Sequence, residues 1–385
     1  MAGIGILLIT VAVRLLWYPV VVSDYTYFGK PWFDLLASHA GLTAFAEPFA
    51  DYAPAYLYLL KFLTFIPVSS LVGEKTLSLL FDALIAYLGY LILKHASQWS
   101  LRKDVLFAVA VAFFALPTVM VNSSLWGQTD ALYSSGVIAS LFGILLGAPL
   151  FAALAFGVAI SFKVQAVFFA PVLVGYLLRR KETWKYLLVP PLVFFLSVVP
   201  ALIGGGSPSY WLFIYLVQAG EYPWLSVSAQ SIFAFLQPLP LTAFATSIAF
   251  WLGMAAAALV AIVVIYLMKR MPELVAERVV LVSLAAALLL PYLLPRMHER
   301  YFYLADLLAV LYAFYRPRRF FVPVLVVGTS LMSYMPFLSR QVSFLSWAQV
   351  DLRVPALILL IPIVVVIYDL WQMPKQEVSR IHAAP

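Results

Sequence analysis

Successive apolar runs of near-bilayer length dominate this sequence and limit the folds open to it. Hydrophobic residues make up 64% of the 385 residues and charged residues only 11%, and the mean hydropathy is +0.99. A helix needs about 20 mainly apolar residues to cross a bilayer, and only helices and closed barrels satisfy their backbone in lipid. We therefore expect an all-α membrane protein, because a soluble helical core of this size would need far more charge on its outer faces.

The apolar runs predict about 12 transmembrane helices within a single multi-spanning domain over residues 1–385. The runs that can serve as spans are 3–22, 75–93, 105–121, 130–147, 149–162, 164–178, 186–203, 242–268, 279–294, 303–315, 320–336 and 353–371. The runs 149–162 and 164–178 are short, so they are expected to form a bent pair. The segment 52–72 is ambiguous, since it can form either a thirteenth span or a helix lying at the interface.

The distribution of basic residues decides between these two readings of 52–72. If this segment does not cross and the N-terminus is cytoplasmic, the basic clusters at 94–103, 179–185, 269–278 and 316–319 all fall in inner loops, as the positive-inside rule expects. If it crossed, either these clusters or Asp24 would lie on the wrong side. We therefore predict an amphipathic interface helix at 52–72, cytoplasmic termini, and two large outer loops at 23–74 and 204–241.

Several functional classes are disfavoured by the same composition. The net charge of +7 follows from the inner loops, so it is not taken as a nucleic-acid footprint. The absence of cysteine excludes disulfides and thiolate metal sites. No nucleotide-binding motif occurs in the inner loops, and no internal repeat of the kind found in many transporters is evident. The first run carries Arg14 and lacks a cleavage pattern, so it is expected to be retained.

Four short polar segments interrupt the apolar pattern at 23–25, 122–130, 162–165 and 298–301. On the predicted topology each lies at the outer end of a span. Polar side chains at that depth are costly unless they line a cavity or meet a polar ligand. Together they supply carboxylates, amides, cations and a histidine to one membrane surface, which suits an anionic lipid head group and a hydroxyl acceptor.

These segments also resemble the multi-spanning GT-C glycosyltransferases that use polyprenyl-phosphate sugars. The similarity is to the branch with the dolichyl-phosphate-glucose-dependent glucosyltransferases of N-glycan precursor assembly and their prokaryotic relatives, and it extends over residues 1–306. It rests on Asp24 after the first span, Asp51-Tyr52-Ala53-Pro54, Trp126-Gly127-Gln128-Thr129-Asp130, Phe162-Lys163-Val164-Gln165-Ala166 with Ala170-Pro171, and Met297-His298-Glu299-Arg300. The eukaryotic branch has a His-rich version of 126–130, from which this sequence departs.

The resemblance implies a GT-C fold and an inverting transfer of a glucose- or mannose-type hexose to an acceptor hydroxyl. Such a transfer needs one base, since the departing phosphate ester is already a good leaving group. Asp24 is the first candidate for this base and Asp51 the second. The alternative for each is structural: Asp24 or Asp51 would cap the helix that follows it.

Cations fixed in a partly dry site would stabilise the departing phosphate. Lys163, His298 and Arg300 are the candidates, and Arg300 can bind phosphate through two nitrogens. The alternatives are that Lys163 extends toward the interface from a short helix and that Arg300 pairs with Glu299 or Asp306.

Candidate contacts to the sugar and acceptor are Trp126, Gln128, Asp130, Gln165, Glu299 and Tyr301, with Tyr25, Tyr27, Glu221 and Tyr222 as further possibilities. The alternatives are that Trp126 belongs to the aromatic belt and that Asp130 caps the next span. No tight Asp-x-Asp pair marks a metal site, and no cofactor is implied. The expected partners are a polyprenyl-phosphate-linked hexose, a lipid-linked glycan or glycolipid acceptor, and membrane lipids, without nucleic acid.

A lipid-linked sugar flippase or another secondary transporter is the main competing hypothesis. It shares the span count, but it predicts essential ionisable residues at mid-membrane rather than at the ends of loops. A structural or assembly subunit without activity is a third hypothesis, which the candidate base and cations disfavour.

Overall fold

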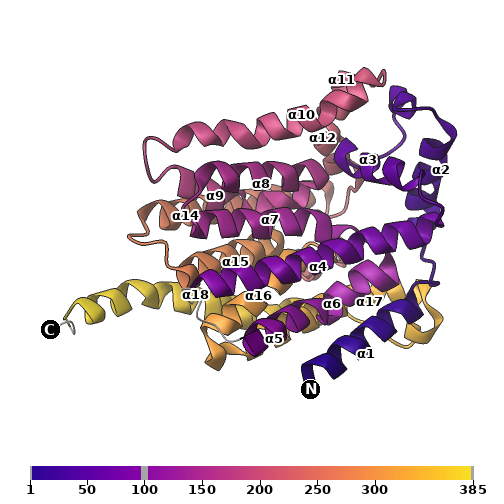
Figure 1. Cartoon of the computed structure of the whole chain (residues 1–385). Coiled ribbons are helices and arrows are strands. Elements are labelled where there is room, and N and C mark those ends of the chain that lie inside the picture. Colours follow the sequence, from indigo (N-terminus) through magenta and orange to yellow (C-terminus); the bar gives the residue numbers. More distant parts are fainter. Residues whose placement is uncertain (1, 97–102, 383–385) are drawn as a thin grey trace. The chain divides into compact units, whose positions relative to one another are not determined.

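Helices form nearly all of the regular structure in the computed structural model, which describes residues 2–96 and 103–382 (Figure 1). Among the described residues, six apolar helices are long enough to cross a membrane, and a seventh crossing results if one bent pair counts as a single span. The six lie at Ser70–Ala96, Trp184–Ile203, Ala243–Arg270, Ala276–Leu293, Pro317–Gln341 and Arg353–Met373. The expected helical membrane character is therefore confirmed, and the full count of crossings stays a prediction.

The remaining expected runs also fall on apolar helices, but on shorter ones. They are α1 (Ala2–Trp17), α7 (Asp130–Leu145), α8 (Pro149–Phe162), η4 (Val164–Phe169) with α9 (Ala170–Leu177), and α16 (Tyr303–Tyr315). The helix α8 ends at Lys163, whose backbone is extended (φ −151°, ψ 141°). The two runs are therefore separate helical segments, and the expected bend between them stays a prediction.

The segment 52–72 does not form one continuous helix. Pro54 begins the short helix α3 (Pro54–Leu63), and α4 (Ser70–Ala96) starts after a turn that contains Pro67. Ten residues rise only about 15 Å, so α3 is too short to cross a bilayer. Because α4 begins earlier than the expected run at 75, Glu74 lies inside this helix and not in the outer loop 23–74, and Lys75 lies within the helix and not at its start; both are buried.

The chain divides into two compact units, each of which is described by itself. The first comprises residues 1–167, 180–223 and 337–349. In it α4 packs on α5 (Lys103–Phe114) and α7, and α8 packs on α7 and α10 (Val189–Ile203). Arg102, one of the cations assigned to an inner loop, lies outside the described residues.

The loop elements of the first unit gather at one end of these helices (right in Figure 1). They are η1 (Tyr25–Gly29), α2 (Lys30–Ser38), η2 (Thr43–Ala46), α3, α11 (Pro208–Trp211) and α12 (Ile214–Glu221). An aromatic core joins them, in which the Trp211 indole donates to the Phe45 carbonyl at 3.1 Å and packs on the Phe45 ring. The two expected outer loops thus share one core, which positions the polar residues at their edges.

The second unit comprises residues 168–179, 224–336 and 350–385. Its helix α14 (Ala243–Arg270) packs on α9 and α15 (Ala276–Leu293), and α15 packs on α16 and α18 (Arg353–His382). A short parallel pair of strands, β1 (Ser226–Val227) and β2 (Met297–His298), joins two of its loops. The first unit also contains η5 (Trp184–Leu188) and η7 (Ser343–Leu345), and the second contains α13 (Phe233–Leu236) and η6 (Pro317–Arg319). The helix α17 (Phe321–Gln341) belongs to the second unit up to Pro336 and to the first from Phe337.

Candidate functional site

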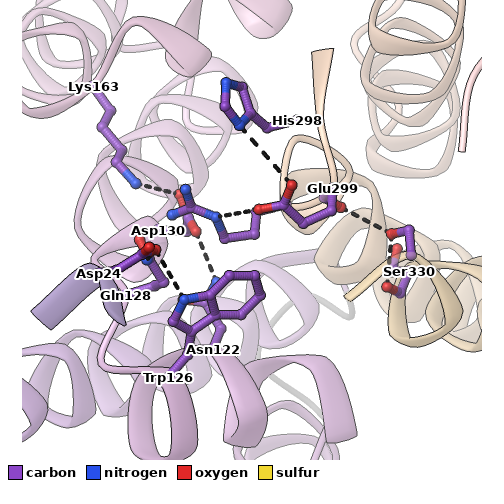
Figure 2. Close-up of polar contacts among 11 residues, drawn as sticks. Asp24, Asn122, Trp126, Gln128, Asp130, Lys163, His298, Glu299 and Ser330 are labelled. Carbon is purple, nitrogen blue, oxygen red and sulfur yellow. Dashed lines mark hydrogen bonds and ion pairs between the residues drawn. The ribbon is translucent and has the colours of Figure 1, made fainter. Parts of the chain in front are cut away.

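Asp24 lies where α1 gives way to the π-helical turn η1, and its carboxylate is held by two donors. The Trp126 indole Nε1 donates to Asp24 Oδ2 at 3.0 Å, and Gln128 Nε2 donates to the same oxygen at 2.5 Å (Figure 2). The side chain makes no capping hydrogen bond to η1. Both contacts therefore fix one carboxylate oxygen, and neither uses Oδ1.

The two donors come from an irregular stretch that follows a helix break. Pro117 begins α6 (Pro117–Met120), which continues as the π-helix η3 (Val121–Trp126), and the axis bends by 53° from the preceding helix. Gly127 then adopts a left-handed conformation (φ +81°), which glycine reaches at low cost. This reversal directs Trp126 and Gln128 to the same carboxylate.

Trp126 is enclosed by protein and does not belong to an aromatic belt. Only 1% of its surface is exposed, and its ring stacks on Phe337 with centroids 4.7 Å apart. The indole N–H thus has a fixed direction toward Asp24 (Figure 2).

A second polar group forms around Asp130, the first residue of α7. Lys163 Nζ donates to Asp130 Oδ1 at 2.7 Å, and Asn122 Nδ2 donates to Asp130 Oδ2 at 2.7 Å (Figure 2). Lys163 is 6% exposed and lies 5.1 Å from the centroid of the Tyr52 ring. It is therefore an enclosed, paired cation and does not extend to the interface.

Asp51, the second candidate base, lies at the edge of the aromatic core. Ala53 occupies the N-cap position of α3, so Asp51 does not cap that helix. Its carboxylate interacts electrostatically with that of Glu221, and Gln218 donates to its backbone carbonyl. Burial raises the pKa of Glu221, and the negative charge of Asp51 raises it further.

The fourth polar segment forms its own cluster in the second unit. Arg300 Nε donates to Glu299 Oε1 at 3.1 Å, the pairing that sequence analysis gave as its alternative (Figure 2). The His298 ring lies 5.2 Å from that of Tyr301. Strand β2 fixes His298, and two non-glycine residues beside this strand pair, Ser228 and Arg296, have positive φ (62° each). Such strained conformations cluster at functional sites.

The structure therefore brings three of the four polar segments together within the first unit. Of the further candidates, Gln165 is buried, Tyr25 shares a hydrogen bond with Ser70 at 2.7 Å, and Tyr27 is exposed. Among the described residues, no group of three or more His, Cys, Asp or Glu could hold a metal ion.

Four buried polar residues that were given no role at the site from the sequence contact the same region, namely Arg14, Lys75, Ser78 and Asp82. The three charged members could have been recognised from the sequence, because a charged residue inside an apolar run needs a polar partner. Their partners could not be read from the sequence, since they lie 50 or more residues away.

The arrangement at Asp24 leaves its carboxylate able to accept a proton. A carboxylate anchored through one oxygen can accept a proton at the other while keeping a fixed orientation. No family model and no curated protein matches the chain, so the residues and their geometry carry the functional argument.

Proposed function

We propose that this protein is an inverting glycosyltransferase of the GT-C type. It transfers a hexose from a polyprenyl-phosphate-linked donor to a hydroxyl of a lipid-linked glycan, glycolipid or similar acceptor, at the extracytoplasmic face of the membrane. The proposal includes the topology of about 12 spans with both termini inside, to which the inward bias of basic residues gives support.

The contact of Asp24 with Trp126 and Gln128 carries the proposal. A carboxylate at the end of a membrane helix has no need of two fixed donors on one oxygen if it serves only to cap a helix. Held in this way, it is suited to a general base, whose efficiency depends on its position relative to the proton that it takes.

The proposed reaction is a single displacement. The acceptor oxygen attacks the anomeric carbon, its proton passes to Asp24 Oδ1, and the bond from that carbon to the phosphate oxygen breaks. The phosphate leaves with the bonding electron pair, and because the acceptor attacks from the opposite face, the configuration at the anomeric carbon inverts.

The cations would act on the departing phosphate. His298 and Arg300 lie in one cluster with Glu299, and Lys163 forms an ion pair with Asp130. Pairing with a carboxylate fixes the direction of the Arg300 and Lys163 cations before the donor binds, and preorganised charge stabilises a transition state most effectively. In this proposal Trp126 and Gln128 orient the base in addition to bordering the sugar.

The test is sugar transfer by the purified protein in liposomes, with a panel of polyprenyl-phosphate hexoses and crude lipid acceptors. Asp24→Asn keeps the shape of the side chain but removes the base, so transfer should fall about a thousandfold. Asp34→Asn, a carboxylate with a half-exposed side chain on α2, is the matched control and should transfer normally. Near-normal transfer by Asp24→Asn would exclude Asp24 as the base and direct the same test to Asp51.

A transporter of lipid-linked sugars is the second candidate, because one observation favours it. Arg14 of α1 and Asp82 of α4 form a buried ion pair with an N–O distance of 2.8 Å within the apolar helices, and charges at such positions often lie on transport pathways. In the same liposomes, movement of labelled lipid-linked sugar between leaflets without any transfer product would support this candidate over the transferase.

A further inference from the structure

Three polar residues of α4 lie on one face of that helix and are fully enclosed. Lys75, Ser78 and Asp82 have the spacing i, i+3 and i+7, which places them on one side of a helix. Their exposed fractions are 0%, 0% and 1%. We call these three residues the α4 polar face. A membrane helix carries such a face at considerable cost, so its contacts require an explanation.

Lys75 connects the end of α1 to the π-helix η3. Its ammonium donates to the carbonyl of Leu125 at 3.2 Å, and to those of Trp17, Tyr18 and Val20 at 3.0, 3.2 and 2.7 Å. One cation therefore holds both the segment that leads to Asp24 and the segment that carries Trp126.

Ser78 acts on the next residues of that stretch. Its hydroxyl donates to the carbonyl of Gln128 at 2.8 Å, and the Gln128 amide N–H donates to the Asn122 carbonyl at 2.8 Å. The backbone of Gln128 is thus held from both sides while its side chain reaches Asp24.

Asp82 acts through Arg14. Its carboxylate receives Arg14 Nη1 at 2.8 Å, and the same nitrogen donates to the hydroxyls of Ser123 and Ser124 at 2.7 and 3.0 Å. Arg14 Nη2 donates to the Phe114 carbonyl at 2.7 Å, at the end of α5. Arg14 therefore bridges the helix break from one side to the other.

We propose that the α4 polar face and Arg14 position the catalytic carboxylate, by holding the 121–128 segment in register with the end of α1. Backbone carbonyls freed by a helix break must find donors in a membrane, and these side chains supply them. The contacts between Asp24 and its two donors depend on that register, and misplacement by about 1 Å can cost about a hundredfold in rate. The inference rests on the proposed function of Asp24 as the base.

Ser78→Ala tests this proposal, with Ser140→Ala as a matched control. Ser140 is also fully buried, and its hydroxyl donates to a backbone carbonyl, that of Ala152, at the same distance of 2.8 Å. It joins α7 to α8 and does not touch 121–128. We expect Ser78→Ala to lower kcat about tenfold with KM unchanged, and Ser140→Ala to change neither.

A second measurement separates positioning from the reaction itself. Hydrogen exchange followed by mass spectrometry reports the amides of 121–128 directly, and they should exchange faster in Ser78→Ala but not in Ser140→Ala. Equal exchange in the two variants, or equal losses of kcat, would overturn the positioning role. If the wild-type protein transfers no sugar, the proposed function fails, and the exchange measurement still decides whether the α4 polar face holds this segment.

Discussion

At the scale of single residues, the first unit handles buried charge by surrounding it with fixed partners. Asp130 accepts from Lys163 with one oxygen and from Asn122 with the other, and it is only 1% exposed. Removing one member of such a pair leaves an uncompensated charge in a poorly polarisable environment, which costs far more than the pair contributes.

Charge removal at this pair should therefore be strongly non-additive. Lys163→Met should destabilise the protein by about 3 kcal/mol, because Asp130 loses its cation. The double variant Lys163→Met/Asp130→Leu should lose less than the sum of the two single variants, as a double-mutant cycle of unfolding midpoints in detergent would measure. Additive losses would contradict the pairing.

The exposed pair of Lys30 and Asp34 provides the control for that cycle. Its N–O distance is 2.5 Å, but both side chains are more than half exposed. Lys30→Met should leave the midpoint nearly unchanged, since solvent screens exposed pairs.

The residues around Asp24 could be identified from the sequence, but their mutual contacts could not. Asp24, Trp126 and Gln128 stood out because polar groups at the ends of apolar runs are unusual. That Trp126 and Gln128 would both donate to Asp24 depends on the π-turn and the left-handed Gly127, and neither is visible in a hydropathy pattern. The run was expected to begin at residue 75, so nothing in the sequence indicated that Lys75 would lie well inside the helix.

At the scale of elements, close helix packing depends on small residues at defined positions. Gly136 of α7 faces α8, and an added Cβ would lie 2.8 Å from the Cβ of Ala159 and 3.0 Å from the carbonyl oxygen of Ala155. At Gly328 of α17, no described atom outside the adjacent turns of its own helix backbone lies within 4 Å of the same position. Two helical glycines thus have opposite surroundings, although nothing in their sequence neighbourhoods distinguishes them.

Substitution of these glycines by alanine should have opposite effects. Gly136→Ala should destabilise the protein by about 1–3 kcal/mol, because the backbone of α8 must move away. Gly328→Ala should be neutral or stabilise the protein by up to about 1 kcal/mol, the gain in helix propensity. Unfolding midpoints in detergent measure both, and a stabilising Gly136→Ala would contradict the packing of α7 on α8.

At the scale of the whole molecule, composition was enough to predict a helical membrane protein, whereas the orientation inferred from charge stays a prediction. The grouping of the chain into two units was not predictable, because it depends on which helices pack together. Apolar runs specify that a helix forms, but they carry little information about its neighbours in lipid, where burial does not distinguish one helix from another.

The orientation can be measured because the chain has no cysteine. Single cysteines introduced at Tyr27, which is 73% exposed, and at the exposed Lys181 should react with a membrane-impermeant maleimide from opposite sides of sealed vesicles. Labelling of both positions from the same side would overturn the predicted topology.

The pairing of Arg14 with Asp82 has a consequence for how the protein is made. The two residues are 68 positions apart, so at about 5–20 residues per second the ribosome needs about 3–14 seconds to deliver Asp82 after Arg14. During that interval an arginine in the first helix costs about 3 kcal/mol at the centre of a bilayer. If α1 crosses the membrane as predicted, the insertion machinery or the lipid head groups have to shelter Arg14 until α4 emerges, and α1 reaches its final position late in biogenesis.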